Sequence, residues 1–313
     1  MILSVSRRTD IPNYYSEWFI NRMKEGFLYV RNPMNIHQVS KIMLSPDIVD
    51  CIVFWTKNPK PMLDKLDALK EYKYYFQFTL TGYGRDVEKG LPHKKKEVIP
   101  VFKELSKKIG SEKVIWRYDP IFFNENYTKE YHINAFSQIA EELEGYTHRC
   151  VISFVDFYAK NRKGMEELKL QETKERQLVS FSGKLQEVAL AKGIEVFSCA
   201  EKIDLSECGI KHGSCIDKNI IEEITGCKIE ASKDKNQREE CGCVESVDVG
   251  SYNTCLNGCK YCYANFSEKA VRSNVKKCDV NSPLLCGNVE DIDKITERKM
   301  KSLKIQQISL FDL

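Results

Sequence analysis

The sequence predicts an α/β fold, a partial parallel (β/α)6 TIM-like barrel followed by a cysteine-rich segment. Short β-rich runs alternate with longer helical patterns through the first two thirds of the chain. Most of these runs are too apolar to have one face in water, as expected of buried parallel strands. Eleven of the 13 cysteines fall between Cys199 and Cys286, where the alternation has stopped. A doubly wound open sheet has the same periodicity and remains the alternative.

Six runs rich in β-branched and aromatic residues are the expected strands, at residues 2–6, 51–55, 74–80, 113–118, 150–155 and 194–199. Helical patterns occupy residues 14–26, 61–72, 96–110, 131–145 and about 168–193. Gly26, Gly110 and Gly145 end three of these patterns and Gly193 follows the last, as is typical of helix ends. Cys51 and Cys150 are expected to be core residues.

Three regions follow from this pattern. Residues 1–202 form the barrel core, residues 203–290 a cysteine-rich metal-cluster region, and residues 291–313 a charged tail. The cysteine-rich region should be held together by metal more than by a hydrophobic core. The tail starts with DIDKITERKMKSLK, for which helical structure is expected.

Composition and charge limit the partners and the cellular compartment that we expect for the protein. The 313 residues include 48 basic and 45 acidic side chains, a net charge of +3 that neither demands nor excludes nucleic acid. There is no apolar run of transmembrane length, and Arg7, Arg8 and Asp10 interrupt the start where a signal peptide needs its apolar core. We therefore expect a cytoplasmic protein without membrane association. In a reducing compartment its cysteines favour metal or redox chemistry over disulfides.

Polar side chains follow the expected strands. Since the carboxyl ends of barrel strands surround the active site, these side chains are candidate catalytic residues lining a pocket. The alternative is that they are helix N-caps and ion pairs that order the strand ends. The candidates are Arg7, Arg8, Asp10, Lys57, Asn58, Arg117, Asp119 and Asp156.

The stretch TCLNGCKYCYAN, residues 254–265, places Cys255, Cys259 and Cys262 in a C-x3-C-x2-C spacing. Structural zinc sites favour a closed set of four ligands. Three thiolates in this spacing suit a [4Fe–4S] cluster with one iron open to an exogenous ligand. The alternative is a zinc knuckle completed by Cys278 or Cys286.

This motif resembles that of the radical S-adenosylmethionine (SAM) superfamily, and GCKYCYA is especially similar to its DNA-photolyase-like branch, which includes spore photoproduct lyase. The resemblance implies that the three cysteines hold a [4Fe–4S] cluster whose open iron binds SAM. Reductive cleavage then yields a 5′-deoxyadenosyl radical. It also implies an electron donor of the ferredoxin or flavodoxin type, a partial (β/α)6 barrel, and Tyr261 and Tyr263 as cofactor-binding residues.

A narrower resemblance covers nearly the whole chain. SVSRRTDIP (4–12), VFWTKNP (53–59), FTLTGY (78–83) and VIWRYDP (114–120) resemble the bacterial domain-of-unknown-function family 1848, whose terminal cysteine cluster is likened to that of radical SAM enzymes. The resemblance brings no established activity. The cysteine motif here follows all six repeats, whereas the superfamily usually carries it after the first strand.

The remaining cysteines predict a second centre. Cys199, Cys215, Cys241 and Cys243 could supply four thiolates to a second [4Fe–4S] cluster or to zinc, with Cys208 and Cys227 as substitutes. A closed set of four ligands would make this centre structural or an electron relay.

The tail carries a separate signal. QISLF, Gln307–Phe311, resembles the peptide with which bacterial replication and repair proteins bind the sliding clamp, although such a tail can also pack on its own domain. The sequence as a whole predicts a radical SAM enzyme with nucleic acid as a candidate substrate. The alternative is a non-enzymatic, metal-stabilised module that binds nucleic acid or senses redox state.

Overall fold

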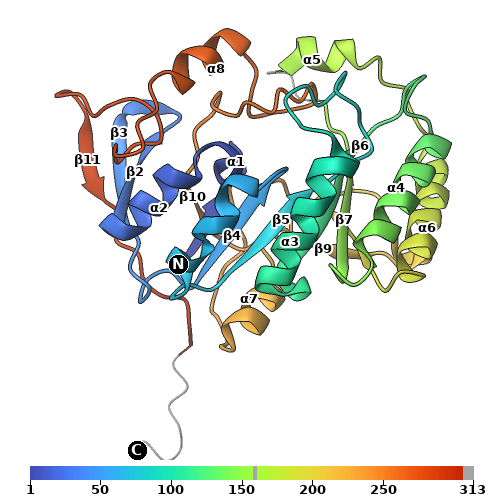
Figure 1. Ribbon diagram of the computed structural model, residues 1–313, viewed down its shortest axis with the longest axis horizontal. Helices are drawn as coiled ribbons and strands as arrows, with labels where there is room; N and C mark the ends of the chain where they lie inside the picture. Colours follow the sequence, from blue (N-terminus) through green and yellow to red (C-terminus); the bar gives the residue numbers. More distant parts are fainter. Residues whose placement is uncertain (158–160, 306–313) are drawn as a thin grey trace, which may run out of the picture.

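The computed structural model describes residues 1–157 and 161–305, and its main element is an eight-stranded parallel sheet (Figure 1). The order of the strands is β10-β1-β4-β5-β6-β7-β8-β9. Their bounds are β1 Ile2–Val5, β4 Cys51–Thr56, β5 Tyr74–Thr79, β6 Val114–Ile121, β7 Arg149–Phe154, β8 Glu195–Cys199, β9 Lys211–Gly213 and β10 Val247–Asp248.

The six predicted strands are all present and lie side by side in chain order, from β1 to β8. A doubly wound sheet would reverse its strand order at a switch point, and this sheet does not. The sheet is open rather than a closed barrel, with β10 and β9 at its two edges. Both edge strands come from residues 203–290 and were not predicted. β10 pairs with β1 through Leu3 and Val247, and β9 pairs with β8.

One face of the sheet is covered by helices. Leu3, Phe54, Phe76 and Trp116 point to this side and pack in the main hydrophobic core. The helices of the described residues, which include α7 on the opposite face of the sheet, are α1 Ile11–Tyr14, α2 Ser16–Glu25, α3 Ile99–Ile109, α4 Lys129–Leu143, α5 Arg162–Glu167, α6 Glu175–Leu190, α7 Lys218–Thr225 and α8 Glu268–Val275. There are also 3₁₀ turns at Lys60–Leu69, Ser111–Lys113 and Ser206–Cys208 and a π turn at Lys94–Val98. In the described part of the chain, no helix is long and apolar enough to cross a membrane.

The other face of the sheet is covered by α7 and the cysteine-rich segment. Because side chains alternate along a strand, the residues of this face form successive layers. The first layer is apolar and packs against Ile220 and Ile221 of α7; it includes Ile2, Val53, Tyr75, Ile115 and Val151. The next layer, towards the carboxyl ends, is more polar and comprises Ser4, Trp55, Gln77, Arg117, Ser153 and Cys199. The sheet thus presents polar groups where its strands end.

The predicted helices are found with two differences. Gly26, Gly110, Gly145 and Gly193 all have positive φ, as predicted for helix ends. The pattern at 61–72 forms a 3₁₀ helix, Lys60–Leu69, and the one at 168–193 begins only at Glu175. Ahead of it, Lys169 has a φ of 49° and the Gln171 amide donates to the Phe123 carbonyl at 2.8 Å. This contact with the β6 exit overrides the local helical pattern.

A second, three-stranded sheet was missed. β2 Phe27–Asn32 and β3 Asn35–Met43 form an antiparallel hairpin, and β11 Lys294–Glu297 pairs parallel with β3. The expectation of helix at the start of the tail is therefore wrong at β11. Its K-I-T-E sequence carries two β-branched residues, and Glu297 forms an ion pair with Lys41 of β3 at 3.4 Å.

We predict that Trp116→Ala lowers the free energy of unfolding by about 3–5 kcal/mol, because it removes a fully buried indole. Trp116 stacks on Phe136 with 4.6 Å between ring centroids and donates to the Leu80 carbonyl at 2.8 Å. Chemical denaturation measures the loss. Leu190→Ala, at a residue that is 56% exposed, is the control and should stay within about 0.5 kcal/mol of wild type. Equal stability of the two variants would contradict this account of the core.

Candidate functional site

The three-cysteine loop lies at the carboxyl edge of the sheet, although it comes last in the sequence. Its backbone pairs with the segment after β5: the Lys260 amide donates to the Val87 carbonyl at 3.0 Å, and the Gly90 amide donates to the Asn257 carbonyl at 2.8 Å. The Tyr263 hydroxyl donates to the carbonyl of Arg7, just after β1, at 2.6 Å. The loop is therefore fixed to the ends of β1 and β5.

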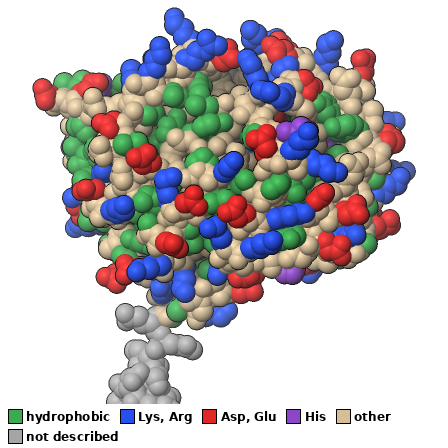
Figure 2. Space-filling view, viewed as in Figure 1, with side chains coloured by type: hydrophobic (Ala, Val, Ile, Leu, Met, Phe, Trp, Pro, Cys, Tyr) green, Lys and Arg blue, Asp and Glu red, His purple; other side chains and the backbone are tan. Residues whose placement is uncertain are grey.

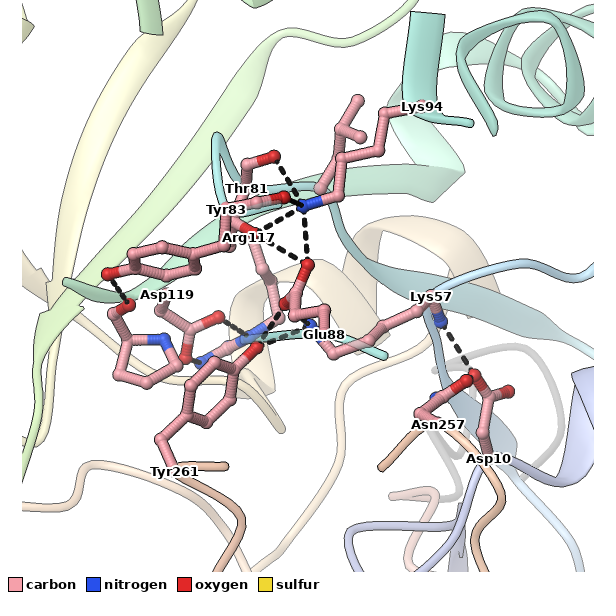
Figure 3. Close-up of polar contacts among 12 residues, drawn as sticks. Asp10, Lys57, Thr81, Tyr83, Glu88, Lys94, Arg117, Asp119, Asn257 and Tyr261 are labelled. Atoms are coloured by element: carbon pink, nitrogen blue, oxygen red, sulfur yellow. Dashed lines mark hydrogen bonds and ion pairs between the residues drawn. The ribbon is translucent and has the colours of Figure 1, made fainter. Parts of the chain in front are cut away.

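A buried carboxylate, Glu88, is central to this contact (Figure 3). Lys57, from the end of β4, donates to Glu88 and to the Tyr261 hydroxyl, both at 2.8 Å. Tyr261 and Lys94 also donate to Glu88. Lys94 makes further bonds to the Thr81 carbonyl at 2.9 Å and the Thr81 hydroxyl at 3.0 Å. Tyr261, which lies between two of the cysteines, thereby joins the loop to strands β4 and β5.

Burial and charge together set the protonation of this cluster. Burial alone would raise the pKa of Glu88, but the two ammonium groups outweigh it and lower that pKa to about 2. Burial tends to lower the pKa of Lys57, yet Glu88 raises it overall. For Lys94 burial dominates, and its pKa is lowered. With both lysines charged, the three groups carry one excess positive charge, and Lys57 acts on the nearby Cys259.

Asp10 connects β1, β4 and the loop. Its side chain caps α1 by accepting from the Asn13 amide at 3.1 Å, so the N-cap interpretation is correct for this residue. It also accepts from the Lys57 amide at 2.8 Å and from the Asn257 side chain at 3.1 Å. Burial raises the pKa of Asp10 despite these hydrogen bonds.

The two predicted arginines after β1 converge on Asp248 of β10. The Asp248 carboxylate accepts from the Ser4 hydroxyl at 2.9 Å and the Arg7 amide at 2.8 Å, and it lies 3.9 Å from the Arg8 guanidinium. The Arg7 guanidinium itself turns to Asp234, at 3.5 Å. Both arginines thus bind the segment that leads into the cysteine loop.

Arg117 and Asp119, at the end of β6, form a bidentate ion pair, with 2.9 Å between Arg117 Nε and Asp119 Oδ1. The same guanidinium donates to the Cys215 sulfur at 2.6 Å and lies over the Trp55 ring, 5.3 Å from its centroid. Asp119 also accepts from Ser153 at 3.4 Å. This pair therefore faces the second group of cysteines.

The last two predicted positions have more local roles. Asn58 accepts from the Lys60 amide at 3.4 Å and so organises the turn after β4. Asp156 forms an ion pair with Arg238, and both side chains are about half exposed. This pair connects the end of β7 to the cysteine-rich segment.

The residues of the three-cysteine loop fit a metal cluster by their chemistry. Cys259 is buried and Cys255 and Cys262 are partly buried, and the three thiols act on one another electrostatically. Burial raises the pKa of all three, that of Cys255 to about 12, so their thiolates need a cation. Backbone N–H groups already favour the thiolate at Cys255, from Asn257 and Asp10, and at Cys262.

Two further observations bear on this loop. Thr9 Oγ1, in the segment after β1, and Asn265 Oδ1, at the end of the cysteine motif, are buried and have no hydrogen-bond partner in the described part of the protein. Cys278 and Cys286, the suggested fourth ligands of a zinc knuckle, are joined to each other by a disulfide. In this state neither can complete the set of three thiols.

The second predicted group of cysteines is also brought together. The sulfurs of Cys199 and Cys215 are 2.9 Å apart, and Cys243 is in hydrogen-bond contact with both Cys215 and Cys241. Cys208 lies elsewhere, against α6, and Cys227 is exposed. Within residues 1–157 and 161–305, no three histidine, cysteine or acidic side chains are arranged to hold a metal ion as they stand.

Sequence reasoning missed Glu88, Lys94, Asp248 and Asn257. Glu88 and Lys94 follow the predicted TGYG exit of β5 but lie beyond the few residues considered there. Asn257 lies inside the cysteine motif itself. Gln77 was a signal that could have been used. It is a polar residue within the apolar run YYFQFT, and it indicates polar groups on the inner face of the sheet, the face that α7 and the cysteine-rich segment cover. The peptide Gln307–Phe311 lies outside the described residues.

We predict that Glu88→Gln destabilises the protein by about 3 kcal/mol at pH 7, because two lysines that are largely but not fully buried lose their counter-charge. The folded pKa of Glu88, about 2, lies below its ordinary value of 4.5. Its stabilisation is therefore present above about pH 4.5 and is lost as the pH falls towards 2. Denaturation at pH 7 and at several acidic pH values should show the difference from wild type shrinking with acidity. Glu104→Gln, on the exposed side of α3, is the control; a difference that is constant with pH would contradict the assignment.

Comparison with known proteins identifies the family of this chain. Among curated proteins, no match is found. The family model described as Domain of unknown function (DUF1848) matches residues 2–264, a range that includes the strand exits, the Glu88 cluster and both groups of cysteines. The chain therefore belongs to the DUF1848 family.

Proposed function

We propose that the chain is an iron–sulfur enzyme of the radical SAM type, in which Cys255, Cys259 and Cys262 hold a [4Fe–4S] cluster. The observation that carries this proposal is the position of the loop. Three thiols, one buried and two partly buried, lie at the carboxyl edge of a parallel sheet, beside a buried carboxylate whose two lysine partners give excess positive charge. A set of three thiols leaves one iron open, as chemistry on a bound sulfonium requires.

The arrangement of the strands supports this proposal. The strands β1, β4, β5, β6, β7 and β8 of the large sheet lie next to one another in chain order, as strands do in a partial barrel. Radical SAM enzymes usually carry the motif just after the first strand. Here the loop comes late in the chain, yet Tyr263 binds Arg7 and Asn257 binds Asp10, both just after β1. This contact between the loop and the end of β1 supports the proposal.

The chain's own residues have distinct tasks in this proposal. Lys57 and Lys94 outnumber Glu88 in charge and offset the negative charge of the nearby thiolates. Thr9 Oγ1 and Asn265 Oδ1 are buried acceptors suited to the methionyl ammonium of SAM. The [4Fe–4S] cluster, when bound, supplies the electron that cleaves the sulfonium of SAM. A ferredoxin- or flavodoxin-type donor would then reduce the [4Fe–4S] cluster again.

The surface around the loop supports nucleic acid as the substrate. Leu256, Tyr263 and Phe266 are 42%, 39% and 44% exposed. Lys and Arg side chains gather along the upper rim of the molecule, over α8 and α5, with hydrophobic side chains between them (Figure 2). Exposed basic residues there are Arg162, Lys163, Lys269, Arg272, Lys276 and Lys277. Aromatic side chains within a basic rim are typical of surfaces that bind single strands.

We predict that anaerobically purified protein contains about four irons per chain at the loop and, once reduced, cleaves SAM to 5′-deoxyadenosine and methionine. Cys259→Ala should lose both the iron of the loop and the cleavage, because it removes one of three ligands. Elemental analysis and chromatography of the products measure the two effects.

Cys227→Ala is the matched control, since Cys227 is an exposed thiol outside both groups of cysteines. It should retain iron and cleavage. Cleavage by Cys259→Ala at the wild-type rate would remove the role assigned to the loop. Wild-type protein that binds nucleic acid but neither holds iron nor cleaves SAM would favour the non-enzymatic module.

We also predict that Phe266→Ala weakens binding of a single-stranded oligonucleotide about fivefold or more, through the loss of one stacking surface. Fluorescence anisotropy at fixed salt measures the affinity. Leu190→Ala, an exposed apolar residue on α6, should bind as wild type does. Equal affinities of the two variants would exclude this surface as the binding site.

A further inference from the structure

A second thiol centre lies against the inner face of the sheet, at the end of β8. Cys199 is the last residue of β8, Cys215 follows β9, and Cys241 and Cys243 form a C-x-C pair. All four are buried, with exposed fractions of 2–7%. Their thiols form one connected chain of contacts from Cys199 through Cys215 and Cys243 to Cys241. Three segments of the chain, the end of β8, the residues after β9 and the C-x-C pair, thus meet at one point.

The backbone around these cysteines is fixed by side chains of the sheet. The Cys215 carbonyl accepts from the Tyr75 hydroxyl and from the Gln77 side chain, both at 2.8 Å. The Ile216 amide donates to the Cys243 sulfur at 3.4 Å, the kind of contact that favours a thiolate. A Cβ at Gly213 would lie 2.9 Å from Phe197 Cβ, so the chain passes β8 as closely as only glycine allows.

Two guanidinium groups adjoin the four thiols. Arg117 Nη1 donates to the Cys215 sulfur at 2.6 Å, and Arg7 acts electrostatically on Cys243. Each arginine also has a carboxylate partner, Asp119 or Asp234. Arg7 Nε is buried and has no partner in the described part of the protein. Although each arginine also pairs with a carboxylate, guanidinium groups this close to sulfur stabilise thiolates over neutral thiols, as a metal tetrathiolate requires.

We propose that Cys199, Cys215, Cys241 and Cys243 bind one zinc ion, which fixes the cysteine-rich segment to the inner face of the sheet. A single ion suits this site because the thiols lie in direct contact, whereas a four-iron cluster would have to sit between them. With Zn–S bonds of about 2.3 Å, tetrahedral zinc separates its sulfurs by about 3.8 Å. The contact of 2.9 Å between Cys199 and Cys215 would open by about 1 Å as the thiols lose their protons.

The inference is independent of the radical SAM proposal, because the two centres share no ligand. The test measures zinc and iron in full-length protein purified without air or chelator. We expect one zinc per chain in wild type and none in the double variant Cys241→Ser, Cys243→Ser. Cys259→Ala should lose iron and keep its zinc, and Cys227→Ser should keep both, since Cys227 is exposed and outside the site.

A second measurement applies if the double variant does not fold. Wild-type protein produced with Co²⁺ in place of zinc should show the intense visible bands of a tetrahedral cobalt tetrathiolate. Absence of these bands would overturn the proposal. So would wild-type protein with eight irons and no zinc, zinc retained by the double variant, or a Cys199–Cys215 disulfide in a peptide map of the non-reduced protein.

Discussion

The candidate site depends on one buried ion cluster, in which Glu88 lies between Lys57 and Lys94 and receives a hydrogen bond from Tyr261. Removing charged groups from water is costly unless each is paired, and here one carboxylate pairs with two ammonium groups. Lys57 comes from the end of β4, Lys94 follows β5, and Tyr261 comes from the cysteine loop. The cluster therefore fixes the loop against the sheet only when all three segments are in place. The segment after β5 pairs Glu88 with Lys94 within itself, but Lys57 and Tyr261 depend on Glu88 from that segment.

The same cluster relates the position of the loop to its chemistry. Three raised thiol pKa values mean that the loop by itself favours neutral cysteines. The excess positive charge of the cluster acts in the opposite direction at Cys259. Tyr261, which binds the loop to Glu88, lies between Cys259 and Cys262. The residue that holds the loop in place and the thiols that the lysine charge affects are therefore only one or two residues apart. At the second group of cysteines, Arg117 and Arg7 supply the positive charge next to the thiols, as Lys57 does at Cys259.

Much of the fold could be predicted from local patterns. Buried parallel strands are continuous apolar runs, and the six runs from Ile2 to Cys199 were identified within a few residues of their bounds. The short edge strands β9 and β10 could not be, because two or three residues carry no periodicity and their pairing is decided by β8 and β1. The grouping of Cys199, Cys215, Cys241 and Cys243 was predicted from cysteine count and spacing. Glu88 was not, because it lies in an irregular segment and two of its partners, Lys57 and Tyr261, are distant in sequence.

The pairing of β1 with β10 has a consequence for how the protein is made. Leu3 pairs with Val247, so β1 leaves the ribosome well before its neighbour β10 is translated. At about 5–20 residues per second, this interval is on the order of tens of seconds. During that time one edge of β1 has no neighbour, and the inner face lacks the cysteine-rich segment that covers it. The nascent chain is thus exposed to aggregation until its late segments close the sheet from both sides.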